Sequence, residues 1–307
     1  SLVNLSADLL RYKYKAWWTE TMPVLGELLV QLGSSVGDEV DELLQSIAAM
    51  CGSADGTGLE EQQLKALRSV LGAAVSSIGP VRFVSVVPLD EVAVLGQNAT
   101  WIVSALRSNI QRAELSFFSD YVMPLIERLA VQAPSATAEQ KFRITQLELK
   151  LWGLLVPLCS TRPTDVPATF KRIAKQLGDA LRQNKALRTT VCSAVTALIR
   201  NSAKDAASAG AAASEGQQNV AEISKFDKNF LPILFNVFGE TSGGGESDAV
   251  VGTIAAFASI ADPQRLNAFF KTIMKKLLEA ISDAEAGDSR DRHVMTDLAL
   301  ALAGSLS

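Results

Sequence analysis

The residue types that most often carry out catalysis are scarce in this 307-residue sequence. There is a single histidine, His293, so any Ser-His-Asp triad would have to use it. We interpret His293 as a solvated residue near the start of a helix. The segment Gly33–Gly37 matches the GxSxG pattern of a nucleophile elbow, which needs a strand before it and a helix after it. Because Leu25–Leu32 has helical periodicity, we predict that 33–37 is an interhelix loop.

Metal and cofactor chemistry have little support in the residue pattern. Cys51, Cys159 and Cys192 lie far apart and form no CxxC pair, so we predict three small buried hydrophobes in a reducing compartment. The sequence has no Walker loop, no GxGxxG, no HExxH and no EF-hand loop. We therefore expect a chain that is not an enzyme and that uses no cofactor, no metal and no small-molecule substrate.

Charge is distributed unevenly along the chain. The net charge is -4, which argues against a wholly basic nucleic-acid binder. Residues 160–204 nevertheless carry nine basic side chains against two acidic ones, an excess of +7. Residues 38–61 carry seven acidic side chains and no basic one. One interpretation is a basic ridge that meets phosphates and an acidic end that meets a basic protein. The alternative is that helical repeats keep charged outer faces for solubility and that the excess arises by chance.

On the first interpretation, two sets of side chains are candidates for binding. The basic set, for RNA or phosphate, is Arg162, Lys171, Arg172, Lys175, Arg182, Lys185 and Arg188. The acidic set, for a protein surface, is Asp38, Glu39, Asp41 and Glu42. Thr164 or Asp165 could cap the helix that begins at 166, with Pro167 in its first turn, and we favour Asp165. Arg162 stays open between a phosphate contact and a structural role.

The elements that must position these residues are helices. Apolar residues recur at Val166, Phe170, Ile173, Leu177 and Leu181, which is the spacing of one helix face. Similar stripes run through 59–77, 92–106, 114–131, 139–156, 186–200, 222–238, 248–260 and 264–281. With 48% hydrophobic and 20% charged residues, the chain can bury a sizeable core.

Short breakers separate these stripes. We predict loops at 52–58 and 241–247, and a flexible insertion near 205–221, although its alanines could extend the preceding helix. The short apolar stretch Val81–Val87 is the best candidate for a strand, but we interpret it as a helix end leading into Pro88. No run of apolar residues approaches the length of a membrane span, and no secretory signal opens the chain. Because it begins with Ser1 and not Met, we expect a section of a longer protein.

Prolines recur in apolar helical contexts, as at Pro23, Pro124 and Pro232. The steps from Pro88 to Pro124 to Pro157 are 36 and 33 residues, which suits the period of a helix pair. We therefore predict an all-α fold, an α-solenoid of stacked antiparallel HEAT/armadillo-like helix pairs that forms one continuous section over 1–307. Such a surface suits protein or RNA partners.

Two long strings, Cys159–Val166 followed by Phe170-Lys171, and Lys228–Asn236, resemble segments of the ribosomal-RNA-processing protein 12 family. Shorter similarities in the same order are Tyr12-Lys13-Tyr14 with Trp17, Gly79-Pro80, Val87-Pro88-Leu89, Phe117-Phe118 with Tyr121 and Pro124-Leu125, Leu151-Trp152 with Leu155 and Pro157, and Thr190-Val191-Cys192. The resemblance covers most of the chain.

The resemblance implies a section of a large non-catalytic α-solenoid of the nucleus and nucleolus that shuttles to the cytoplasm. It implies association with small-subunit precursors, a part in pre-rRNA maturation and nuclear export of pre-ribosomal particles. The partners would be pre-ribosomal proteins and pre-rRNA, with no membrane. The alternative is a HEAT-repeat transport receptor that binds a Ran-type GTPase, nuclear pore components and protein cargo.

Overall fold

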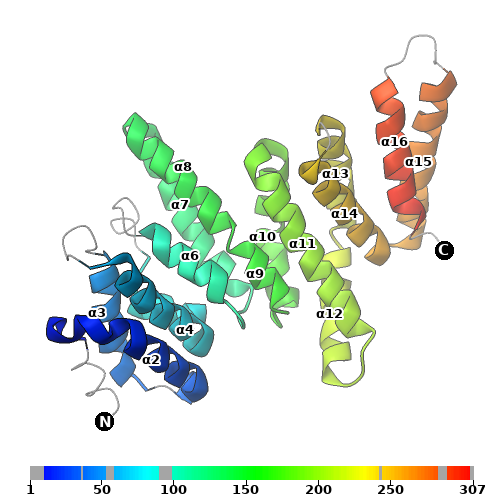
Figure 1. Cartoon of the computed structure of the whole chain (residues 1–307). Coiled ribbons are helices and arrows are strands. Elements are labelled where there is room, and N and C mark those ends of the chain that lie inside the picture. Colours follow the sequence, from blue (N-terminus) through cyan, green and yellow to red (C-terminus); the bar gives the residue numbers. More distant parts are fainter. Residues whose placement is uncertain are drawn as a thin grey trace. The chain divides into compact units, whose positions relative to one another are not determined.

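The computed structural model describes residues 10–35, 37–52, 59–89, 99–241, 244–282 and 289–304. Within these ranges the chain is helical and has no strand, so the predicted all-α class is confirmed (Figure 1). The chain divides into two compact units, one of residues 1–113 with 120–161 and the other of residues 114–119 with 162–307. We describe each unit by itself, and the single continuous section stays a prediction.

Unit 1 is built around a long helix, α4 (Glu61–Val86). Its other helices are α2 (Trp18–Leu32), α3 (Glu39–Gly52), α6 (Ala99–Asn109), α7 (Met123–Gln132), α8 (Ala138–Trp152) and α9 (Leu155–Ser160). The helices α2, α3 and α6 pack on α4, while α8 contacts both α6 and α7. Leu67, Leu71 and Phe83 of α4 are fully buried. The apolar face of α4 therefore forms the core of this unit.

By length and composition α4 is also apolar enough to cross a membrane, which differs from our expectation. Its 18-residue window has a mean hydropathy of 1.4, and 50% of that window is buried inside the protein. Ala, Gly and Ser interrupt its large apolar side chains, so these side chains form no continuous run along the helix. Because three helices cover it, we assign α4 to the core.

A break divides α4 near its C-terminal end. Gly79 has φ 81° and ψ 161°, and Pro80 follows it. This region of backbone conformation favours glycine, and the proline cannot donate the hydrogen bond that would continue the helix. Residues 81–86 then complete the last turns of α4, ahead of Pro88. The interpretation of Val81–Val87 as a helix end is confirmed.

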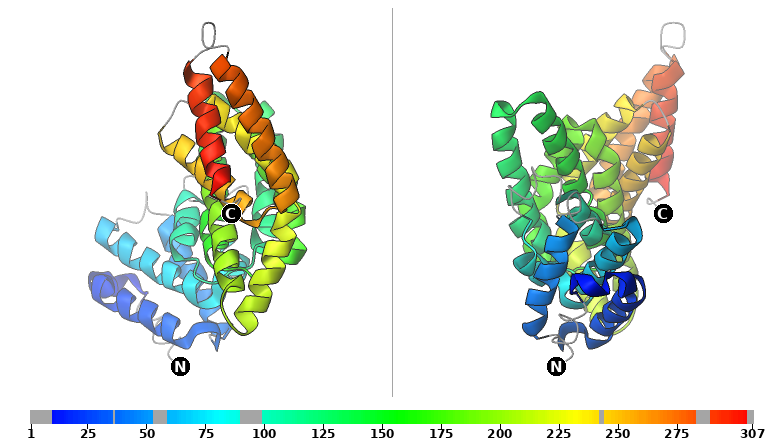
Figure 2. Two further views of the ribbon diagram at one scale, coloured as in Figure 1. Left: turned by 90° about the vertical axis from the view of Figure 1, so that its right-hand side faces the viewer. Right: turned by 60° about the vertical axis from the view of Figure 1, so that its left-hand side comes forward.

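Unit 2 consists of helix pairs in chain order. Its helices are α10 (Val166–Gln183), α11 (Lys185–Ala206), α12 (Ala211–Ser224), α13 (Asp227–Glu240), α14 (Gly245–Ile260), α15 (Pro263–Ser282) and α16 (Ser289–Ala303). The pairs are α10 with α11, α13 with α14, and α15 with α16; α11 also contacts α14, and α14 contacts α16. Figure 2 shows the orange α15 and the red α16 side by side in both views. These are stacked antiparallel pairs of the predicted kind.

Aromatic rings hold the first two pairs of unit 2 together. The ring of Phe170 lies 5.3 Å from Phe226, edge-on, and 6.3 Å from Phe230. Phe230 in turn stacks on Phe257 of α14 at 5.0 Å. Each such contact contributes about 0.5–1.5 kcal/mol beyond the burial of its area. Phe170 is fully buried, as the apolar stripe predicted.

The predicted flexible insertion near 205–221 is wrong for most of its length. Helix α11 continues to Ala206, and after a short turn with Gly210 at φ 78° the chain forms α12. Alanine is the strongest helix former, and α12 packs against α11, so the segment has both a local preference and a partner. Low sequence complexity here marks a regular helix.

The predicted loops are only partly described. Residues 53–58 and 242–243 lie outside the described residues. Gly244 has φ 78°, and α14 begins at Gly245. The loop predicted for 241–247 therefore ends earlier than expected, and residues 245–247 belong to the first turn of a helix. Glu246 and Asp248 lie in that turn, where acidic side chains favour the helix dipole.

Candidate functional site

Helix α10 presents the densest part of the basic set. Its apolar stripe, Val166, Phe170, Ile173, Leu177 and Leu181, is buried at every position. The proline at the start is tolerated because the first amides of a helix have no intrahelical acceptor. With that face held in the core, Lys171, Lys175 and Arg182 are exposed on another face of the same helix. The amphipathic pattern thus positions three cations along one element.

These three cations line a groove between α10 and α13. The groove has a volume of about 330 Å³ and lies within unit 2. Its lining residues are Lys171, Ala174, Lys175, Gly178, Asp179 and Arg182 of α10, Phe226 just before α13, and Asn229, Phe230 and Ile233 of α13. The two helices are in contact. We name this surface the α10–α13 groove.

Three further members of the basic set lie away from this groove. Arg172 is exposed on α10 but does not line the groove, and Lys185 is exposed at the start of α11. Arg162 has a left-handed backbone, φ 59°, and its guanidinium lies 3.2 Å from the carboxylate of Asp205. The side chain of Arg162 remains 52% exposed. The structure therefore gives Arg162 a bond between the start of unit 2 and α11.

Arg188 has a different role from the one predicted. Only 1% of it is exposed, and its Nε donates to the carbonyl of Leu181 at 2.9 Å. Its two terminal nitrogens contact Glu240 at 2.6 Å and Glu246 at 3.3 Å. The hydrogen bond and charge of Arg188 lower the pKa of Glu240. A buried guanidinium with three partners is not available to a phosphate, so its inclusion in the binding set is wrong.

Asp165 stabilises unit 2, but not by capping its own helix. Its carboxylate accepts the backbone N–H groups of Leu115 and Ser116, both at 2.7 Å, and makes no capping bond to an amide of α10. Burial raises the pKa of Asp165, but these hydrogen bonds outweigh it and leave the pKa below its ordinary value. Glu114 reciprocates by accepting the amides of Thr164 and Asp165 at 3.0 Å. The predicted cap is instead a clasp between two segments distant in sequence.

The acidic set is partly neutralised in three dimensions. Arg82 of α4 lies 3.3 Å from Asp38 and 3.1 Å from Asp41. Glu42 is exposed on α3, and the side chain of Glu39 lies outside the described residues. Because the neutralising arginine is distant in sequence, the absence of basic residues between 38 and 61 overstated the negative charge of this surface.

The candidate nucleophiles and ligands occupy unreactive settings. Cys51, Cys159 and Cys192 are buried, as predicted, and burial raises their pKa values to about 11, 12 and 11. His293 is exposed on α16. The GxSxG match follows helix α2 and begins with a short 3-10 turn at Gly33–Ser35, so the strand that a nucleophile elbow needs does not precede it. Across the described ranges, no three His, Cys, Asp or Glu residues could hold a metal ion together.

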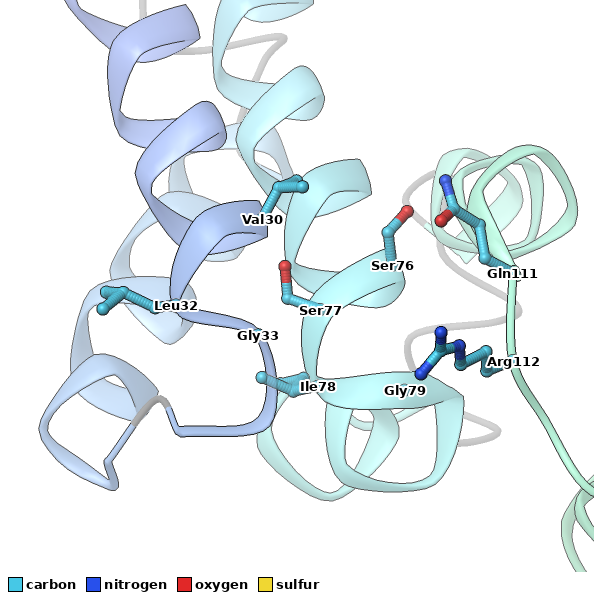
Figure 3. Close-up of a pocket in the computed structure, with 9 residues that line it drawn as sticks. All are labelled: Val30, Leu32, Gly33, Ser76, Ser77, Ile78, Gly79, Gln111 and Arg112. Carbon is cyan, nitrogen blue, oxygen red and sulfur yellow. The ribbon is translucent and has the colours of Figure 1, made fainter.

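A second hollow, of about 590 Å³, lies in unit 1 at the break in α4 (Figure 3). It is lined by the end of α2, by 76–79 of α4, and by Gln111 and Arg112. The hydroxyl of Ser76 donates to the carbonyl of Asn109 at 2.9 Å, and that of Ser77 to Ala73 at 2.7 Å. Both hydroxyls are thus used within the unit. Figure 3 shows Arg112 extending toward the turn at Gly79.

Charge alone did not reveal the α13 side of the α10–α13 groove. Asn229 and Ile233 lie in the string Lys228–Asn236, and Phe226 lies just before it, in a stretch whose periodicity predicted a helix but no binding surface. Asn229 could have been found from its position in the helical repeat of α13, because it lies on the exposed face of the helix, next to the buried Phe230. Which helix lies opposite α10, however, depends on the packing of pairs.

Comparisons with known proteins agree with the helix pairs. The family model described as ribosomal RNA-processing protein 12, HEAT repeats, matches residues 1–241. The chain is 32% identical over 306 residues to an RRP12-like protein of Homo sapiens, covering 96% of this chain and 22% of that protein. An RRP12-like protein of Gallus gallus is 32% identical over 280 residues, covering 87% of this chain and 20% of the relative.

A more distant relative is ribosomal RNA-processing protein 12 of Saccharomyces cerevisiae, 24% identical over 248 residues, which cover 75% of this chain and 20% of that protein. The chain therefore spans about a fifth of the length of these relatives. Stacked helix pairs, a family model that covers more than half of the residues, and a human relative aligned over nearly the whole chain lead to one assignment. The chain belongs to the HEAT-repeat family of ribosomal RNA-processing protein 12.

Proposed function

We propose that this chain is a section of a non-catalytic scaffold of ribosome biogenesis. The scaffold associates with precursors of the small ribosomal subunit and supports pre-rRNA maturation and the nuclear export of pre-ribosomal particles. It works in the nucleus and nucleolus and shuttles to the cytoplasm. The names of the relatives refer to ribosomal RNA processing, and this supports a role of the chain in ribosome biogenesis. The α10–α13 groove supports a contact with RNA.

The observation that carries the RNA contact is the exposure of Lys171, Lys175 and Arg182 along one wall of the groove. Lys171 and Lys175 form no ion pair in the part of the chain that the structure describes, and Arg182 has only a surface pair with Asp179 at 3.3 Å. Exposed pairs of this kind contribute about 0–1 kcal/mol. All three cations are therefore available to phosphates, whose neutralisation releases counterions and drives binding.

The acidic surface gives less support to the alternative of a transport receptor for a Ran-type GTPase. Arg82 already pairs with Asp38 and Asp41, which leaves a smaller negative surface for a basic partner. Protein contacts with other components of the pre-ribosomal particle remain part of the proposal, and nuclear pore components belong to the alternative.

The test uses the full-length protein in cells, carrying Lys171→Glu, Lys175→Glu and Arg182→Glu together. Wild type should co-sediment with small-subunit precursors, and its crosslinks to pre-rRNA should be lost or strongly reduced in the variant. The matched control is Lys271→Glu, Lys275→Glu and Lys276→Glu, the same charge change on exposed residues of α15. Absence of the wild-type protein from all pre-ribosomal fractions, or nucleotide-dependent binding of a Ran-type GTPase instead, would overturn the proposal.

A further inference from the structure

The α10–α13 groove has an apolar floor beneath its charged rim. Ala174 and Gly178 of α10 face Phe230 and Ile233 of α13 across it. Gly178 sets the depth, because a Cβ at this position would lie 3.3 Å from Cδ1 of Ile233. The volume of about 330 Å³ is at the small end of the range for ligand pockets, about 300–1,000 Å³. A space of this size and character suits one flat, largely apolar ring system.

A polar group with unused bonding capacity lies at the edge of this floor. Asn229 is exposed, and no hydrogen bond within the described part of the chain uses its side-chain carboxamide. A carboxamide both donates and accepts, so it can pair with a base edge that presents a neighbouring acceptor and donor, as adenine does. The rim can therefore recognise a nucleobase by its hydrogen-bonding edge, in addition to binding phosphates by their charge.

Two planar groups are placed to stack on such a base. Phe226 lines the groove and is half-buried, with its ring edge-on to Phe170 at 5.3 Å. Arg182 lines the other wall with a side chain that is 57% exposed. Bases splayed out of single-stranded RNA stack on aromatic rings and on guanidinium planes.

All three cations fit the phosphates on either side of that base, since the guanidinium of Arg182 can stack through its face while its edge donates to a phosphate. Lys171 and Lys175 are one turn apart, about 6 Å along the axis, and Arg182 lies about 10 Å beyond Lys175. We infer that the α10–α13 groove binds one unpaired nucleotide of single-stranded RNA, with its base on the apolar floor and its flanking phosphates at Lys171, Lys175 and Arg182. This inference rests on the proposed function, because it specifies the kind of RNA that α10 contacts.

Other occupants would use only some of these features. A-form duplex RNA offers phosphates and 2′-hydroxyls but keeps its bases stacked, so it would use the cations and not the floor. An acidic peptide would also meet the cations, yet its carboxylates would not fill the apolar floor, and Asn229 would have no base edge to pair with. The combination of floor, carboxamide and stacking groups favours an unpaired nucleotide.

The experiment measures binding of the 307-residue chain to a fluorescent single-stranded RNA and to a duplex of the same length by anisotropy. Two variants change the groove without changing charge: Ala174→Leu fills the floor, and Asn229→Leu removes the carboxamide. Each should weaken single-strand binding by about tenfold while leaving duplex binding and the salt dependence unchanged. Gln218→Leu, the same kind of change on the exposed face of α12, is the control and should have no effect.

The outcomes separate this inference from the proposed function. In one outcome, the wild-type protein binds RNA with a salt dependence that Lys171→Glu, Lys175→Glu and Arg182→Glu together abolish, but Ala174→Leu and Asn229→Leu leave binding unchanged. The inference that a base enters the groove is then wrong, and the proposed contact with phosphates stands. If polyglutamate competes as well as single-stranded RNA, the occupant is an acidic peptide and the inference fails. If wild type binds no RNA, both fail. Thermal unfolding identifies a variant that has lost its fold. If Ala174→Leu does not fold, Asn229→Leu still tests the inference, because it changes an exposed side chain.

Discussion

At the scale of single residues, burial decides what a positive charge does in this protein. Arg188 and Lys175 are close in sequence and both belong to the basic excess of residues 160–204. Lys175 is exposed on the rim of a groove, whereas Arg188 is only 1% exposed and bound to Glu240 and Glu246. Removing a buried cation leaves its carboxylate and carbonyl partners without a hydrogen-bond donor and an opposite charge, whereas changing an exposed cation alters only the surface potential.

We expect Arg188→Ala to lower the free energy of unfolding by about 2–3 kcal/mol. The cost comes from the lost bonds to Leu181, Glu240 and Glu246 and from the space left in the core. RNA affinity per folded molecule should not change. Denaturant unfolding and anisotropy measure the two effects, and Arg200→Ala, at an exposed position of α11, is the control. A loss of affinity without a loss of stability would return Arg188 to the binding set.

The clasp made by Asp165 should make stability depend on acid pH. Its pKa is lower in the folded chain than in the unfolded one, so its contribution is present above the unfolded value of about 3.9 and is lost as pH falls through the folded pKa. Asp165→Asn should therefore cost about 1–3 kcal/mol near neutral pH, and this difference from wild type should narrow below about pH 4. Chemical unfolding at several pH values tests this. The control is Asp179→Asn, which removes an exposed ion pair and should change stability little. If the stability of wild type, Asp165→Asn and Asp179→Asn depended on pH in the same way, the clasp would be contradicted.

At the scale of elements, packing determined which residues of α12 matter. Gly216 lies against α11, and a Cβ there would come within 2.7 Å of both the Ser202 carbonyl oxygen and the Asp205 carbonyl carbon. Both of those atoms belong to backbone, which cannot move aside as a flexible side chain can. The glycine thus allows α12 to approach α11 closely.

Gly216→Ala should therefore destabilise the protein, although alanine is favoured over glycine by about 1 kcal/mol in an unconstrained helix. We expect a loss of about 1–3 kcal/mol from the displaced helix and faster amide exchange within α12. Ser214→Ala, at an exposed position of the same helix, should be neutral or slightly stabilising. A stabilised Gly216→Ala protein would show that α12 is not held closely to α11.

At the scale of the whole molecule, a net charge of -4 is compatible with an RNA contact because binding depends on local charge. The cations of the α10–α13 groove are exposed, whereas the acidic set lies in unit 1 and part of it is neutralised by Arg82. The acidic overall balance limits non-specific binding elsewhere on the surface.

Three phosphate contacts predict a definite salt dependence for single-stranded RNA. The slope of log affinity against log salt should be about -2, since each phosphate contributes about -0.7. Substituting Lys171, Lys175 and Arg182 with Glu should bring the slope close to zero, while the matched change at Lys271, Lys275 and Lys276 should leave it near -2. Titrations at several salt concentrations measure this. An unchanged slope in the groove variant would place the phosphate contacts elsewhere.

The sequence by itself determined the features that depend on local periodicity. The stripe from Val166 to Leu181, the burial of the three cysteines and the exposure of Lys171, Lys175 and Arg182 all follow from the 3.6-residue repeat and from hydrophobicity. The resemblance to the family likewise depended on strings of residues, and the family match confirmed it.

Only the tertiary structure decided which distant residues meet. Glu240 and Glu246 neutralise Arg188, Asp165 binds the amides of Leu115 and Ser116, and α13 faces α10 to form the groove. Helical periodicity identifies the face that a helix buries, but not the partner that covers it. That choice is made by the stacking of helix pairs, because side chains far apart in sequence come together only when the apolar faces pack.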